Sequence, residues 1–210
     1  MVVPSSQKIK PSQRVPHKVY QVPLKPDFVD IAVKREMEGE WVTAMTENIE
    51  IQTGICEGLL NSTEILEEIK GFDLIVYDAP ITVCAQLVGE LLDIPRVEIL
   101  IISPPFLGLT HMAPMPVSYV PQPMLGFSDK MTFVQRVLNS LVYLGSGVLL
   151  GPILFNPMNA LKVKYNIKPE RSYQETAADV EMVLISADFA LEYPQPLLPG
   201  TNLASELVSS

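Results

Sequence analysis

The sequence predicts an α/β fold built on a parallel sheet, and one stretch carries most of that prediction. Residues 72–78 form a short apolar run, rich in β-branched and aromatic side chains, between Gly71 and Pro80. Such a run is typical of a strand buried on both faces. Apolar residues then recur at helical spacing up to Leu92, and a second apolar run covers 97–102. A strand, a helix and a strand in this order make one βαβ unit, hence a parallel sheet with a right-handed crossover.

Asp78 is the candidate functional residue of this unit. It stands where the first strand ends, and ligands of open parallel sheets bind at the carboxyl ends of the strands. The carboxylate therefore has two interpretations. It either takes part in a site or accepts hydrogen bonds from the backbone amides of the next helix, which is the commoner role for an aspartate in such a turn.

The elements before this unit follow from proline positions and apolar spacing. Residues 1–17 contain several prolines and little periodicity, which predicts a tail or loop, and 19–22 suit a short edge strand. Helical spacing runs from 28 to about 70, and its last helix opens after Asn61-Ser62-Thr63. The same triplet is an N-glycosylation sequon, which matters only if the chain enters the secretory pathway.

After the unit, residues 103–127 are rich in proline and predict a long loop that leaves the carboxyl end of the sheet. A loop of this length inside a compact domain is usually functional. The elements expected after it are a helix over 130–144, a second helix near 157–165, a strand over 180–185 and an extended exit over 193–199.

Composition limits the classes of function. The chain has 210 residues, 48% of them hydrophobic, which is enough for one good core. Its net charge is -9, and the bases of residues 1–35 are spread among prolines, so no nucleic-acid site is expected. Cys56 and Cys84 lie in apolar helical patterns and are interpreted as core thiols, outside any disulfide framework. With only His17 and His111 available, no metal site is expected, and no residue is a candidate for binding a cofactor.

The membrane question centres on residues 137–155. Met1–Gln21 lacks the apolar stretch of a signal peptide. Between Arg136 and Lys162 there is no charge, and this window exceeds the roughly 20 residues that cross a bilayer. Interspersed Gly, Pro, Ser and Asn residues dilute the apolar run. We therefore expect a buried or interfacial helix, with 137–155 touching a membrane surface without crossing it.

Four segments in register resemble the amino-terminal half of the UDP-glucuronosyltransferases and their wider UDP-glycosyltransferase family. Together they extend over more than half of the chain, and four in order are more specific than any one. They are Phe72–Asp78 with Cys84, then Ser118–Pro121, then Ser128–Phe133 with Arg136, Val137 and Asn139, and finally Phe189–Pro199.

The resemblance implies a Rossmann-like parallel sheet with flanking helices, the incomplete amino-terminal domain of a two-domain GT-B-type glycosyltransferase. In such enzymes this half binds a small lipophilic acceptor, and the other half binds the UDP-sugar, the co-substrate. The implied division is a tail over 1–18, a partial acceptor-binding domain over 19–200 and a second tail over 201–210, where the linker to the UDP-sugar domain would begin. The implied location is the membrane or lumen of the endoplasmic reticulum.

The resemblance also gives Asp78 a role. In the family a His removes the acceptor hydroxyl proton, and an Asp that matches Asp78 orients that His. Neither His17 nor His111 matches that His by position. Relative to the family, the 210-residue chain is therefore expected to lack the segment with the His at one end and the UDP-sugar domain at the other. The implied activity is that of a UDP-glucuronosyltransferase-like hexosyltransferase, catalytically incomplete when alone. The alternative is a non-catalytic truncated isoform that binds and modulates full-length relatives.

Overall fold

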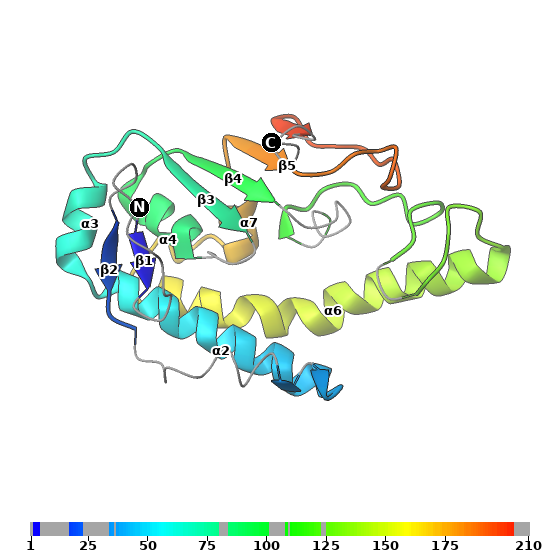
Figure 1. Cartoon of the computed structure of the whole chain (residues 1–210), viewed down its shortest axis with the longest axis horizontal. Helices are drawn as coiled ribbons and strands as arrows, with labels where there is room; N and C mark the ends of the chain where they lie inside the picture. Colours follow the sequence, from blue (N-terminus) through cyan, green and yellow to red (C-terminus); the bar gives the residue numbers. More distant parts are fainter. Residues whose placement is uncertain are drawn as a thin grey trace.

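The protein is described by a computed structural model that covers residues 2–4, 17–22, 34–35, 37–79, 84–100, 108, 110–122 and 125–203. Two parallel sheets lie within these residues (Figure 1). The smaller sheet pairs β1 (Val2–Pro4) with β2 (Lys18–Tyr20). The larger sheet has the order β3 (Ile75–Ala79), β4 (Arg96–Leu100), β5 (Met182–Ile185) and β6 (Thr201–Leu203).

The predicted βαβ unit is confirmed. β3 leads into α4 (Cys84–Leu92), and β4 returns parallel to β3 with Ile75 opposite Arg96. The predicted strand over 180–185 is β5, which pairs with β4. The fold class is therefore α/β, with a four-stranded parallel sheet flanked by helices.

Parts of both predicted tails belong to strands. Val2–Pro4 form β1, and Thr201–Leu203 form β6 beside β5. Of the other predicted segments, the expected helix over 28–33 and much of the loop over 103–127 lie outside the described residues.

Only one face of the larger sheet is covered by described helices, so the prediction of a strand buried on both faces is wrong. Tyr77 and Glu98 are neighbours in register, are buried, and lie on the same side as α4, because the side chain of Gln86 in α4 donates to Glu98. Val76 points the opposite way, because side chains alternate along a strand, and it is 56% exposed. β3 also stands at the edge of the described sheet. We call the side of Val76 the open face.

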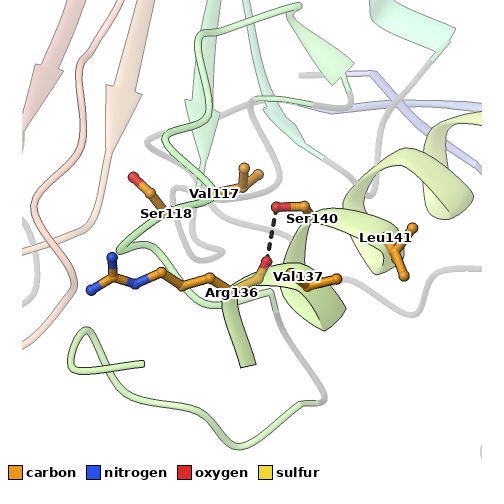
Figure 2. A pocket seen from close by; sticks show the side chains of 6 residues that line it. All are labelled: Val117, Ser118, Arg136, Val137, Ser140 and Leu141. Carbon is orange, nitrogen blue, oxygen red and sulfur yellow. Dashed lines mark hydrogen bonds between the residues drawn. The ribbon is translucent and has the colours of Figure 1, made fainter. Parts of the chain in front are cut away.

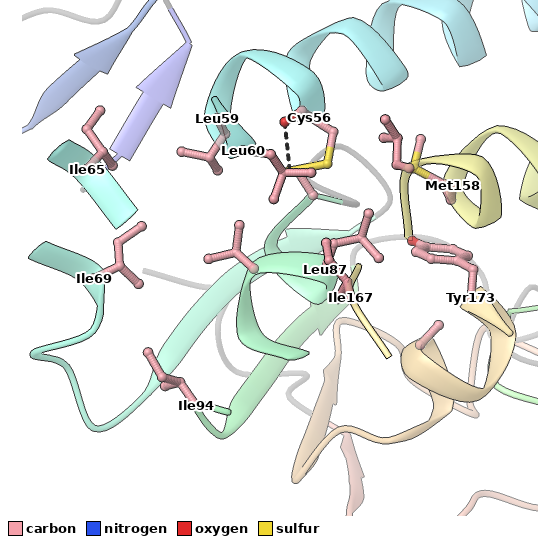
Figure 3. Close-up of a cluster of buried hydrophobic side chains, with 14 of the residues drawn as sticks. Cys56, Leu59, Leu60, Ile65, Ile69, Leu87, Ile94, Met158, Ile167 and Tyr173 are labelled. Carbon is pink, nitrogen blue, oxygen red and sulfur yellow. Dashed lines mark hydrogen bonds between the residues drawn. A yellow bond between two sulfur atoms is a disulfide. The ribbon is translucent and has the colours of Figure 1, made fainter. Parts of the chain in front are cut away.

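The core lies on the covered face, among five helices. They are α4 and, in addition, α2 (Trp41–Leu60), α3 (Thr63–Ile69), α6 (Phe133–Lys164) and α7 (Tyr173–Ala178). Leu87, Met158 and Ile167 bring α4, α6 and the segment after α6 into one buried cluster (Figure 3). The inner residues of α2 and α3 complete it. The helical prediction for 41–69 is thus correct in kind.

Buried charges join the helices at this core. The ammonium group of Lys162 donates to Glu90 and to the hydroxyl of Thr176, so α6, α4 and α7 share one network. Arg171 pairs with the second oxygen of Glu90 at 3.2 Å. Both Lys162 and Glu90 are almost fully buried. Loss of one partner would leave an unpaired charge in the core, which is costly.

α6 is one continuous helix, whereas the sequence predicted two helices with a break between them. Pro152 and Pro157 lie inside it, and each removes one backbone donor and crowds the preceding turn. The helix continues through them because its second half is packed against α2 and α7. Phe155 and Met158 are buried there.

Cys56 and Cys84 form a disulfide, which corrects the prediction of free core thiols. Their burial was predicted correctly, but their bonding was not. α2 brings Cys56 against the first residue of α4, and the two Cα atoms are 4.9 Å apart. A single pair of cysteines 28 residues apart has no diagnostic spacing, since its pairing depends on how two helices pack.

Reduction of this disulfide is expected to destabilise the fold. Closing a loop of 28 residues lowers the entropy of the unfolded chain, and the chain-entropy model gives about 3 to 4 kcal/mol for this length. The melting temperature measured with and without reductant checks this. The double variant Cys56→Ala/Cys84→Ala should melt at the reduced temperature and ignore the reductant. Equal melting of the oxidised and reduced wild-type chain would contradict the expectation.

The uncovered sheet should make the isolated chain associate. β3 stands at the edge of the described sheet and has an apolar side chain on the open face, and both features favour pairing between chains. In sedimentation runs, Val76→Lys should raise the dissociation constant of the self-associated form about tenfold, as the loss of one buried valine predicts. Met37→Lys, which changes an exposed apolar residue away from the sheet, is the control. A wild-type chain that stays monomeric at all concentrations would refute this view.

Candidate functional site

Asp78 lies near the carboxyl end of β3, as the sequence predicted, and on the open face. It is opposite Ile99 of β4, which in turn is opposite Leu184 of β5. Tyr77 and Glu98 occupy the covered face one position earlier, so the alternation of side chains directs Asp78 away from the described helices. Any group that Asp78 orients must therefore come from a segment that packs on the open face.

The carboxyl of Asp78 is half-buried, and this burial raises its pKa above the ordinary value. A carboxyl in such a place accepts a proton or a hydrogen bond more readily than one in water. This property suits a group that holds an imidazole and balances its charge. It is equally available to a capping carboxyl, so the position of Asp78 on the sheet, rather than its pKa, distinguishes the two roles.

A second carboxylate, Glu98, is the centre of a buried polar cluster on the covered face. One oxygen of Glu98 accepts from the hydroxyl of Tyr77 at 2.6 Å and from the amide of Gln86 at 3.2 Å. The same oxygen lies 3.1 Å from Nε2 of His111, whose Nδ1 contacts the Thr110 hydroxyl at 2.7 Å. The cluster therefore fastens the beginning of the 110–122 segment to the middle of the sheet.

The Glu98–His111 pair is a positioning element rather than a base for substrate. Burial alone would raise the pKa of the Glu98 carboxyl, but the hydrogen bond and charge of His111 and the bonds from Tyr77 and Gln86 outweigh it and lower the pKa. Both side chains are almost fully buried, so a substrate hydroxyl has no path to the imidazole. Sequence reasoning missed this pair, although a single Glu inside the otherwise apolar run over 97–102 was a usable signal.

The structure also has a shallow pocket of about 280 Å³ far along α6 from the sheet (Figures 1 and 2). It lies between the turn at Val117 and Ser118 and the first part of α6. Figure 2 shows the guanidinium of Arg136 and the hydroxyl of Ser118 on one side, with Val137 and Leu141 along the helix on the other. The full lining is Val117, Ser118, Arg136, Val137, Ser140 and Leu141.

Asn139 fixes the shape of this pocket. Its side chain is fully buried. Its amide donates to the carbonyl oxygens of Val117 and Val120 at 2.8 and 2.9 Å, and its carbonyl accepts from the backbone of Gln122 at 2.7 Å. These three bonds hold the loop on α6, and the pocket opens beside them. The sequence marked Asn139 only through the family resemblance.

In the part of the chain that the structure describes, no group of three or more His, Cys, Asp or Glu side chains is placed to hold a metal ion.

The comparisons with known proteins identify the family. The family model described as UDP-glucoronosyl and UDP-glucosyl transferase matches residues 17–209. The chain is 31% identical over 148 residues to UDP-glucuronosyltransferase 1A1 of Homo sapiens, an alignment of 69% of this chain and 27% of the relative. It is 32% identical over 157 residues to UDP-glucuronosyltransferase 2A2 of Mus musculus, covering 73% and 29%. The chain thus spans less than a third of the length of these curated relatives.

Both findings agree with the sheet topology. The matched region includes every strand of the larger sheet and the whole of α6. The chain therefore belongs to the family of UDP-glucuronosyl and UDP-glucosyl transferases, whose fold is the two-domain GT-B type.

Proposed function

We propose that residues 19–200 are a partial acceptor-binding domain of an enzyme that transfers a sugar from a UDP-sugar to a small lipophilic acceptor, in the manner of a glucuronosyltransferase. The family match over 17–209 carries this proposal. UDP-sugars are the donors of the family, and this half binds no cofactor of its own in the proposal. The segments 1–18 and 201–210 lie outside the proposed domain.

Asp78 is the residue proposed to take part in the chemistry. An acceptor alcohol is a weak nucleophile at neutral pH, and a His held in one tautomer by a carboxylate is activated as its base. The direction of Asp78 toward the open face supports this role, because an added segment can reach it there. His111 is bound to Glu98, so the base is proposed to come from a segment outside these 210 residues.

An oxidising compartment suits this chain. Disulfides form and persist in secreted proteins and in the lumen of the endoplasmic reticulum, and are rare in the cytosol. The buried Cys56–Cys84 bond therefore supports the proposal that the domain works at the membrane or in the lumen of the endoplasmic reticulum.

The alternative function is a non-catalytic subunit that binds full-length relatives. The open face and the position of β3 at the edge of the described sheet favour it, because a partner chain can cover both. Addition of the purified chain to a full-length relative separates the two functions. A modulating subunit changes the rate of the relative at stoichiometric concentration, whereas a mere domain of an enzyme leaves it unchanged.

The Asp78 role predicts a specific kinetic effect. When the remaining segments of a UDP-glycosyltransferase are supplied to this domain, Asp78→Asn should lower kcat for a phenol acceptor by about 10⁴, the size seen when an orienting carboxylate is lost elsewhere. The KM for the acceptor should change little. Asp73→Asn is the matched control, since Asp73 is exposed and precedes β3.

The 210 residues by themselves should transfer no sugar. An enzyme that tolerates Asp78→Asn as well as it tolerates Asp73→Asn would return Asp78 to a capping role.

We also propose that α6 contacts a membrane surface over 137–155. α6 is long and apolar enough to cross a bilayer by length and composition, with a mean hydropathy of 1.7 in its best window, and only 11% of that window is buried. The exposed apolar side chains of α6 include Leu141, Leu144, Val148 and Leu149. An apolar patch of this extent on a soluble surface marks an interaction site, and an interfacial helix buries it without crossing.

Liposome flotation tests this contact. The chain should float with neutral phosphatidylcholine vesicles, and Leu149→Asp should lower the partition coefficient about tenfold or more, since one leucine leaves the apolar phase. Met37→Asp should have no such effect. Protease added outside the vesicles should digest both flanks of α6. Protection of one flank would mean that the helix spans the bilayer, and absence of flotation would remove the proposal.

A further inference from the structure

The pocket beside α6 contains the only charge in a long neutral segment. From residue 131 to residue 161 the chain has one ionisable side chain with a permanent charge, the guanidinium of Arg136. That side chain lines the pocket together with two serines and three apolar residues. The capping box at the start of α6 is formed by Thr132 and Gln135 and does not involve the guanidinium of Arg136.

The donors of Arg136 are mostly available. Its Nε donates to the carbonyl oxygen of Met131 at 3.2 Å. No carboxylate among the described residues forms an ion pair with it. The two terminal nitrogens of a guanidinium form a planar fork that fits two oxygens of a phosphate. The Ser118 hydroxyl lies on the same side of the pocket (Figure 2).

The apolar side of the pocket is continuous with the exposed apolar row of α6. Val137 and Leu141 line the pocket, and Leu144 and Val148 continue the row at helical spacing. Arg136 and Ser140 form the neighbouring row on the same helix. A ligand with an anionic head and an apolar chain would therefore meet both parts of the site at once.

We propose that this pocket binds the headgroup phosphate of an anionic phospholipid, with the acyl chain lying along Val137 and Leu141. The inference deepens the proposed membrane contact of α6 and rests on it. The charge of the lining favours a net negative headgroup over a zwitterionic one, because the lining offers a cation and no anion. Asn139 is the positioning residue, since it holds the loop that forms one wall.

Vesicle partitioning in 150 mM salt tests the site. The whole chain is mixed with phosphatidylcholine vesicles, or with vesicles in which 30% of the lipid is phosphatidylglycerol, and the ratio of the two partition coefficients is the selectivity. The wild-type chain should prefer the anionic vesicles about tenfold. Arg136→Gln should abolish the preference and keep binding to neutral vesicles.

Two matched variants distinguish a specific binding site from general attraction by surface charge. Lys130→Gln removes the same charge from an exposed residue that precedes α6 and does not line the pocket, so this variant should keep most of the preference. Arg136→Lys keeps the charge but loses the planar fork, and should lose most of the preference. Far-UV circular dichroism confirms that each variant is folded.

Each result decides the inference. If Arg136→Gln and Lys130→Gln lose the preference for anionic vesicles equally, or if Arg136→Lys keeps all of it, the preference comes from general surface charge and the site is refuted. Equal binding of the wild-type chain to both vesicles would end the headgroup inference and leave the membrane contact intact. Binding to neither would end both. If the preference is lost to inorganic phosphate at 10 mM but not to chloride of equal ionic strength, the pocket is a free-phosphate site and the lipid assignment is wrong. If the chain forms a dimer that does not bind vesicles, the exposed apolar row of α6 is the contact with a second copy, and the lipid inference is wrong.

Discussion

A parallel sheet needs cover on both of its faces, and this requirement governs the protein. Parallel strands are found almost only with helices on each side, whereas the described helices that pack on this sheet lie on one (Figure 1). The covered face carries the buried core, and the open face carries Val76 and Asp78. A segment that shields the apolar open face would also stand next to the carboxylate. Under the role proposed for Asp78, the segment that shields the open face would also supply the group that this carboxylate orients.

The covered side is organised by buried polar groups as much as by apolar contacts. Arg96 of β4 donates to the carbonyl oxygens of Gln86, Thr176 and Asp179, which ties the sheet to α4, α7 and the turn after α7. Its aliphatic part lies over Gly89, where a Cβ would stand 2.4 Å from the Arg96 side chain. Buried pairs of this kind add little net stability but penalise other packings. They fix the order of the helices against the strands.

Sequence reasoning found what depends on local pattern and missed what depends on packing. The βαβ unit and the place of Asp78 followed from apolar runs and a turn. The Cys56–Cys84 bond did not, because two helices must meet before the thiols can pair. The Glu98–His111 contact joins a strand to a loop, and its only signal in the sequence is a single Glu within an apolar run.

The course of α6 was missed for a related reason. Pro152 and Pro157 favour a break, and only contacts with α2 and α7 keep the helix continuous. The role of Asp78 stays a prediction, since it depends on a second group that the carboxylate would orient.

In the proposed membrane contact, the prolines of α6 limit how deeply the helix can enter the bilayer. Pro152 and Pro157 have no backbone N–H, so the carbonyl oxygens of Val148 and Ile153 lose their usual donors four residues ahead. Water among lipid headgroups can hydrate such oxygens, but the hydrocarbon interior cannot. Val148 and Ile153 both have exposed side chains. In the proposed membrane contact, these two carbonyl oxygens would therefore keep this part of the helix at the level of the headgroups, where water still reaches the backbone.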